Sequence, residues 1–228
     1  MIGFAVGLPP LWDIENGKSR IGIFGLMDQG SNNGRGLIPS PPDPWSRIYA
    51  GWEKPIVIRS NSQINIPKRS KNNILKVAIN ETEYFLVENR NNHFKKGVSI
   101  DSARFKVYQD TDEYPSFIET LMDSVPLSTD DNGVIVGLPS YDLGLPGSGL
   151  LIWHIDNSII SAGLDDFTIN GIISKKGVDL EESDGAQDIG FPSIFLFSDP
   201  STGYFGDMWF EGNEEYERAN KQSVSYTH

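Results

Sequence analysis

The chain has 228 residues, of which 31 are acidic and 19 are basic, so its formal net charge is −12. Affinity for a phosphate backbone comes from clustered Lys and Arg, so an evenly acidic chain is a poor candidate for nucleic-acid binding. No apolar run approaches the roughly 18 residues needed to cross a bilayer, which argues against a transmembrane segment. The absence of cysteine excludes disulfides and thiolate metal sites.

The N-terminal segment begins with a short apolar run that Gly7 closes and Pro9 and Pro10 stop. This pattern predicts the end of an apolar helix. It has neither a basic stretch nor a small-residue cleavage site, so no signal peptide is expected in it. Residues 8–40 are rich in Gly, Asn, Pro and Ser, and they predict a long ordered loop with turns at Asn16-Gly17 and Asn33-Gly34.

Two short helices are expected further along the chain. Asp43 is suited to an N-cap and Pro44 to the first helical position, and an apolar stripe follows as far as Trp52. The second helix is predicted over 116–123, where Ser116 and Glu119 have the spacing of a capping box. Residues 211–222 are highly charged and are expected to be solvated.

Most of the remaining chain predicts β-strands, so the fold class is expected to be α+β with a mostly antiparallel sheet. Leu75, Val77 and Ile79 alternate with polar residues, as in a sheet that has one face in water. The predicted strands are 56–58, 74–79, 83–89, 104–108, 134–138, 149–156 and 193–197.

Histidines are too few and too scattered to predict a zinc site. The three are His93, His154 and His228, and no two lie within one helical turn, as zinc ligands usually do. His154 lies in a predicted strand and shares a face with Asp156. Our interpretation is a hydrogen-bonded, half-buried sheet histidine, with an acid–base pair of His154 and Asp156 as the alternative.

Acidic loops are better candidates for a hard cation, because calcium prefers clustered oxygen ligands on a loop bent by glycine. The best candidate is 179–188, with Asp179, Asp184 and Asp188 as possible calcium ligands, and 130–133 is second. Neither has the EF-hand spacing. The alternative for both is a solvated acidic loop in a chain that is acidic throughout.

Six segments resemble, in the same order along the chain, segments of the secreted immune-inhibitor-A-type metallopeptidases (peptidase family M-six). Residues 7–13 resemble the stretch that follows the zinc helix of that family, and 25–31 resemble the stretch that carries its Met-turn, with Met27 as the methionine. The other matching segments are 44–52, 83–90, 145–156 and 177–185.

The resemblance does not carry over the catalytic residues. The family motif His-Glu-x-x-His-x-x-Gly binds zinc through its histidines and uses the glutamate as general base, and an acidic ligand follows. Aligning its glycine with Gly7 places Met1 at the general base, Phe4 at the second histidine and Pro10 at the acidic ligand. None of these side chains can take over the role of its counterpart.

What remains of the family site is its scaffold. The Met-turn residue Met27 would stay as a structural element with no metal above it, and Phe4 is expected to pack against Val6 and Met27 as ordinary core. Zinc is therefore not expected as a cofactor, and calcium is the candidate.

The resemblance implies the half of a zincin-like domain that follows the zinc helix, as one incomplete domain. Residues 1–52 would hold the end of the zinc helix, the Met-turn loop and the next helix. Residues 53–210 would be mainly β, and 211–228 a charged tail. The stretch 98–143 is longer than the usual family connection, and it could be a partner-binding insert, a lid or a tolerated surface insertion.

The expected function is a non-catalytic fragment or degenerate module of a larger, secreted polypeptide, used for binding an unknown protein or peptide partner or for structure. The alternative is part of an active metalloendopeptidase whose zinc-binding N-terminal half is absent from this chain. Its metal ligands would have to come from His154 or 179–188. A third reading is a gene fragment with no selected function.

Overall fold

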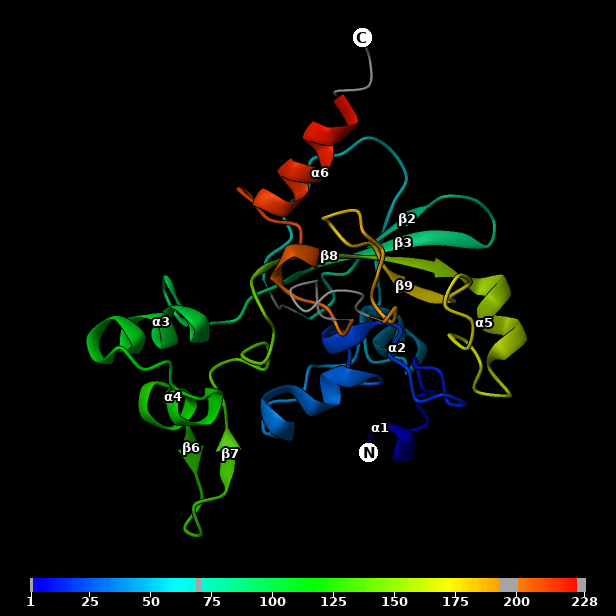
Figure 1. The fold of residues 1–228 in the computed structure, drawn as a ribbon. Coiled ribbons are helices and arrows are strands. Elements are labelled where there is room, and N and C mark those ends of the chain that lie inside the picture. Colours follow the sequence, from blue (N-terminus) through cyan, green and yellow to red (C-terminus); the bar gives the residue numbers. More distant parts are fainter. Residues whose placement is uncertain (1, 69–70, 193–200, 225–228) are drawn as a thin grey trace.

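The computed structural model describes residues 2–68, 71–192 and 201–224, and a five-stranded sheet organises them (Figure 1). Its strand order is β1-β2-β3-β8-β9, and every neighbouring pair is antiparallel except β1 and β2, which are parallel. This confirms the α+β class with a mostly antiparallel sheet. The strands are β1 (Ile56–Ile58), β2 (Leu75–Ala78), β3 (Glu83–Arg90), β8 (Gly149–Asp156) and β9 (Val178–Leu180).

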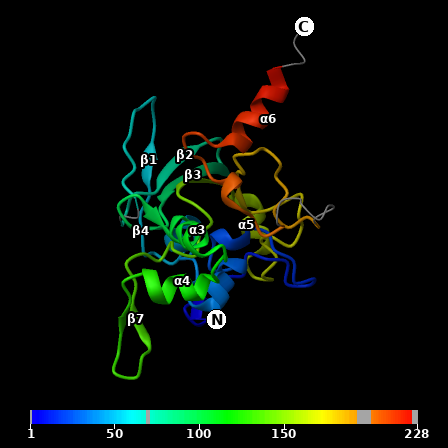
Figure 2. The ribbon, with the colours of Figure 1, turned by 60° about the vertical axis from the view of Figure 1, so that its left-hand side comes forward.

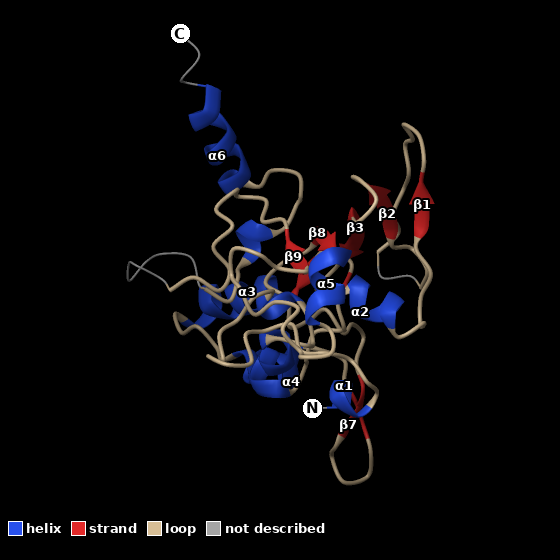
Figure 3. Cartoon of the chain, turned by 90° about the vertical axis from the view of Figure 1, so that its right-hand side faces the viewer, coloured by secondary structure: helices blue, strands red, loops and turns tan. Residues whose placement is uncertain are grey.

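One face of this sheet carries the main core. Leu86 lies opposite Trp153, and Trp153 lies opposite Leu180, and all three are almost completely buried. The N-terminal segments and α2 lie beneath this face, while α6 projects from the other side of the sheet (Figures 1 and 3). The helical segments on and around the core are α1 (Ile2–Ala5), η1 (Gly22–Phe24), η2 (Gln29–Gly36), α2 (Pro44–Tyr49) and α5 (Asn157–Gly163).

The alternation in β2 has the opposite orientation to the one that its sequence suggests. Lys76 pairs with Leu86, so it lies on the core face, where its Nζ is 3.5 Å from the centre of the Tyr84 ring. Val77 and Ile79 lie on the other face and are 37% and 48% exposed. The sheet therefore has one open face, and apolar side chains lie on it.

Helix α2 forms as its sequence predicts. The Asp43 carboxylate accepts from the Ser46 N–H at 2.9 Å, and Pro44 is the first helical residue. Arg47 then joins the helix to the sheet, because its Nη2 donates to Glu88 Oε2 at 2.7 Å.

The long stretch 98–143 packs as a lobe beside the sheet, with a small core of its own (Figure 2). The predicted helix with a Ser116–Glu119 capping box is confirmed as α4 (Phe117–Ser124). The strand predicted at 104–108 is wrong, because these residues lie within α3 (Ile100–Thr111), which Ser99 caps. A hairpin of β4 (His93–Lys95) and β5 (Val98–Ser99) leads into the lobe, and a second hairpin, β6 (Ser128–Thr129) with β7 (Ile135–Gly137), lies within it.

A buried ion-pair network anchors this lobe to the sheet. Arg90 donates from Nε and Nη2 to Asp142 Oδ1 at 2.9 and 2.6 Å, and from Nη1 to Glu88 Oε1 at 3.1 Å. The Asp142 side chain also accepts from the Asn91 N–H at 2.9 Å. The end of the lobe is thus held by charge-assisted hydrogen bonds that are shielded from water.

The N-terminal segment confirms the turns but corrects the position of Phe4. Gly17 and Gly34 have the positive φ angles of 67° and 57° that the predicted turns require. Phe4 does not pack against Val6 and Met27. It is 43% exposed and contacts the Trp12 ring edge-on, with ring centres 5.6 Å apart, because the neighbouring Gly3 is the α1 residue that faces Met27. Met1 lies outside the described residues.

The C-terminal part contains η3 (Phe205–Asp207) and α6 (Glu214–Val224). The charged tail is therefore helical from residue 214, and most of its described side chains are exposed. The strand predicted at 193–197 lies outside the described residues. Within the part that the structure describes, no helix combines the length and the apolar character needed to cross a membrane.

Candidate cation site

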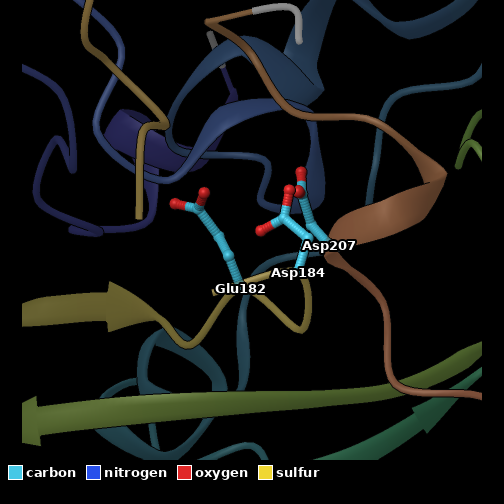
Figure 4. Close-up of side chains that lie close together, drawn as sticks. All are labelled: Glu182, Asp184 and Asp207. Atoms are coloured by element: carbon cyan, nitrogen blue, oxygen red, sulfur yellow. The ribbon is translucent and has the colours of Figure 1, made fainter. Parts of the chain in front are cut away.

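Two segments that are distant in sequence meet beyond the C-terminal end of β9. They are the loop 181–190 and the η3 turn (Figure 4). Asn213 holds them together, because its amide nitrogen donates to Ser183 Oγ at 2.7 Å and to the Gly206 carbonyl at 2.9 Å. The Ser183 N–H adds a bond of 3.0 Å to the Asp207 carbonyl. This network brings three carboxylates into one place.

Glu182 is a buried carboxylate with a strongly raised pKa. It is 3% exposed, and its two oxygens accept from the backbone N–H groups of Asp188 at 2.8 Å and Ile189 at 3.1 Å. Removal from water outweighs these two bonds and raises the pKa of Glu182 to about 7. Burial disfavours the charged form of this carboxyl group, and a bound cation would stabilise that form.

Asp184 and Asp207 complete the group. Asp184 accepts from the Ala186 N–H at 2.9 Å and from the Tyr204 hydroxyl at 3.2 Å, in a turn that Gly185 closes with φ 78°. Asp207 is fully buried and accepts from the Tyr204 N–H at 2.9 Å. Both side chains are therefore held in place by neighbours rather than freely solvated.

The arrangement suits a hard cation. Glu182, Asp184 and Asp207 each offer an oxygen, and the three oxygens lie within 4.8 Å of one another. Oxygen-only donor sets prefer calcium or magnesium, whereas zinc would take nitrogen or sulfur. In the described part of the chain this is the one group of three or more such side chains with ligand spacing.

The residues chosen from the sequence are only partly brought together. Asp184 belongs to the group of three. Asp188 is not one of the three. It lies near Asp184, and burial together with the Asp184 charge raises the pKa of Asp188. Asp179 lies on β9 and is paired with Lys176 at 2.6 Å.

Sequence reasoning missed Glu182 and Asp207. A signal for Glu182 does exist, because Val178 and Leu180 are buried at alternate positions of β9 and Glu182 continues that alternation. Asp207 has no such signal, since only the folded chain places it beside Asp184.

The segment around Met27, whose sequence resembles a Met-turn, is tightly packed and hydrogen-bonded. Met27 is fully buried, and its sulfur lies so close to Gly3 that a side chain at that position would collide with it. Next to it, Asp28 Oδ2 accepts from Ser19 Oγ and from three backbone N–H groups at 2.7–3.0 Å. Pro10 is buried nearby in sequence, and Phe4 points to Trp12.

His154 has the position that its strand predicts. It is half-buried on β8, and its Nε2 lies 3.0 Å from Glu83 Oε2. Asp156 is engaged elsewhere, because its carboxylate caps α5 through the Ser158 N–H at 2.8 Å. His154 is therefore a hydrogen-bonded, half-buried sheet histidine, and its partner is Glu83 rather than Asp156.

A surface cleft lies over the ion-pair network. It is a cleft of about 340 Å³ whose floor includes Arg47, Glu88, Arg90 and Asp142. These charges are paired with one another at 2.6–3.1 Å. The network therefore holds elements together, and the cleft above it presents no carboxylate group with metal spacing.

Comparisons with family models, with curated proteins and with solved structures find no match for this chain. The relation to metallopeptidases consequently depends on the resemblance of the sequence segments alone.

Proposed function

We propose that this chain is a non-catalytic module derived from a secreted zinc metallopeptidase, used for binding or structure, in which Glu182, Asp184 and Asp207 hold a calcium-type cation. The cation would join the loop after β9 to η3 and so fix the C-terminal segments on the sheet. The single observation that carries the proposal is the buried three-carboxylate group and its oxygen spacing.

The donor chemistry around Met27 supports the non-catalytic part. At the positions aligned with the family's metal ligands, Phe4 carries a benzyl group and Pro10 a saturated ring, and neither has a lone pair for a metal. Phe4 contacts the Trp12 ring edge-on, and Met27 is in contact with Gly3. The same segments thus serve as packing.

Electrostatics support the cation. Three acidic side chains around one point repel one another, and burial makes their charged forms costly. Lys176 is the nearby cation that lowers the pKa of Glu182, but its ammonium is bound to Asp179 at 2.6 Å. A divalent ion would neutralise the group and supply the missing positive charge.

Thermal unfolding in chelator and in 1 mM calcium tests the site. If calcium is present at about 100 times its dissociation constant, binding stabilises the fold by about 2.7 kcal/mol, which corresponds to a Tm rise of about 5–10 °C for a chain of this size. The Asp184→Asn/Asp207→Asn variant should lose this rise. The matched control is Asp130→Asn/Asp131→Asn on the exposed turn before β7, which should retain it.

The enzyme alternative makes a different prediction. A working metallopeptidase would contain stoichiometric zinc and would cleave a casein or gelatin substrate in a chelator-sensitive way. We expect neither zinc by elemental analysis nor cleavage by the purified chain, and expression with the sequence upstream of Met1 extends the test to a longer product. Zinc together with cleavage would overturn the non-catalytic part, whereas an unchanged Tm in calcium would overturn the cation site.

A further inference from the structure

The open face of the main sheet is apolar over β1, β2 and the middle of β3 and β8. The side chains that share this face by register are Ile56, Ile58, Leu75, Val77, Phe85, Val87 and Ile152, and Ile79 continues it beyond β2. Ile56, Val77 and Ile79 are 43%, 37% and 48% exposed, and Phe85, Val87 and Ile152 are half-buried. Soluble proteins seldom leave so broad a continuous apolar face uncovered unless it is a binding surface.

The central strands have the composition of strands that are covered on both faces. In β8, Leu151, Trp153 and Ile155 point to the core, while Leu150 and Ile152 point to the open face. Such two-sided apolar runs are typical of sheets with cover on each side. The described chain supplies this second layer only in part. Trp209 pairs with Leu150 and contacts Tyr216 of α6, whereas Val77 and Ile79 remain exposed.

In its described residues, the connection between β1 and β2 places no helix on the open face. Parallel neighbouring strands are usually joined by a crossover that carries a helix. The described residues of this connection, 59–68 and 71–74, have no helix. The Ile66 carbonyl accepts from Asn89 Nδ2 at 2.9 Å, so the described connection meets the open face at its Asn89 end.

The charged groups around the open face indicate what kind of partner could cover its exposed part. Beside the apolar area, the open face carries four acidic side chains: Glu83 and Asp156 at the paired ends of β3 and β8, and Asp179 and Glu181 on and after β9. Two basic groups lie among them, since His154 is 3.0 Å from Glu83 and Lys176 is 2.6 Å from Asp179. Burial and the neighbouring Asp179 charge raise the pKa of Glu181, while His154 and Lys176 act in the opposite direction, so the acidic groups outweigh the basic ones along this border. A second copy of this chain would bring another net charge of −12, whereas a basic partner would be attracted.

We propose that this face docks an amphipathic helix of a partner, with an apolar stripe over β2, β3 and β8 and basic side chains toward β9. The dimensions agree. Strands β3 and β8 have eight residues each and span about 26 Å, and a helix of about 18 residues is roughly 27 Å long. The inference deepens the proposed binding role by naming the surface and the chemistry of the partner.

The probe is a fluorescein-labelled 18-residue peptide of leucine and lysine at helical spacing, followed by anisotropy in 0.15 M salt. Val77→Lys/Ile79→Lys should weaken binding by at least about tenfold, because it removes apolar contact and adds repulsion. The matched control is Val134→Lys/Val136→Lys at and just before β7, where two aliphatic side chains 58% and 66% exposed receive the same charges. This control should stay within about twofold of the wild type.

Several outcomes would overturn the proposal. Equal loss in both double variants would mean non-specific attraction to an acidic protein, and equal binding of the peptide with glutamate in place of lysine would exclude a basic partner. A dimer in sedimentation equilibrium that Val77→Lys/Ile79→Lys dissociates would make the occupant a second copy. Absence of binding refutes it outright. Asp184→Asn/Asp207→Asn should bind the peptide normally, so failure of the cation site and failure of this surface are distinguishable.

Discussion

The raised pKa of Glu182 predicts an unusual pH dependence of stability. Its carboxyl titrates near 7 in the fold and at its ordinary value of 4.5 when exposed, so the folded state binds the proton more tightly. Between these two pH values the folded state holds more protons than the unfolded state, and the free energy of unfolding therefore falls as the pH rises. The whole contribution is present below pH 4.5 and is lost above pH 7.

The magnitude follows from the gap between the two values. At roughly 1.4 kcal/mol per pH unit, ionising Glu182 in the cation-free fold costs about 3 kcal/mol. Side chains with lowered pKa values, such as Glu88 and Asp13, act below about pH 4 and leave this window unaffected. Asp28 and Asp43 have raised pKa values and add slope in the same direction, so a variant is needed to isolate Glu182.

Glu182→Gln provides that comparison. Glutamine accepts only one of the two backbone N–H groups and opposes the other with its own NH₂, which gives a cost that does not vary with pH. Urea unfolding at pH 5, 6, 7 and 8 in chelator should show the wild type losing about 3 kcal/mol more than the variant over this range. Millimolar calcium at pH 8 should restore the wild type only. Parallel pH curves for the two proteins would refute the reasoning.

Substitutions at three further positions probe what holds the fold together. Asp28→Ala should destabilise by about 3 kcal/mol in urea unfolding, because it leaves three buried N–H groups without their acceptor, and Asp28→Asn should cost clearly less. Asp142→Ala should cost about 3–5 kcal/mol, because it leaves Arg90 buried with less compensation, and increased proteolysis within 98–143 would report the loosened lobe. Ser116→Ala should cost about 1 kcal/mol by removing one half of the capping box with Glu119, and thermal unfolding would measure it.

The sequence predicted best where local chemistry decides the structure. The caps at Asp43 and Ser116, the glycine turns at Gly17 and Gly34, and the strand at 149–156 all depend on neighbours within a few residues, and all form. The wrong strand at 104–108 shows the limit of this approach. Phe105, Val107 and Tyr108 favour a strand by residue type, but the Ser99 cap and the burial of Ile100 and Ala103 at helical spacing favour α3.

The candidate site was only half accessible to sequence reasoning, because its ligands come from two segments. Asp184 could be chosen from a loop rich in carboxylates and glycine, and Glu182 could have been chosen from the alternation of β9. Asp207 is brought in by the hydrogen bonds of Asn213, which no spacing in the sequence encodes. The preference for Asp179 failed for a related reason, since Lys176 neutralises it within the same strand region.

The position of Lys76 connects the fold to the proposed surface. A strand that alternates apolar and charged residues would ordinarily turn the apolar set to the core, yet β2 turns Leu75 and Val77 to the open face and covers the Tyr84 ring with Lys76. Leu75 is 9% exposed and Val77 is 37% exposed, so the open face is covered at the Asn89 end of β2 and uncovered toward Ile79. A sequence keeps an apolar set on a face when burial there stabilises some state of the protein. The helix-bound state proposed above would be such a state, because it would bury Val77 and Ile79 and leave Lys76 where it already lies.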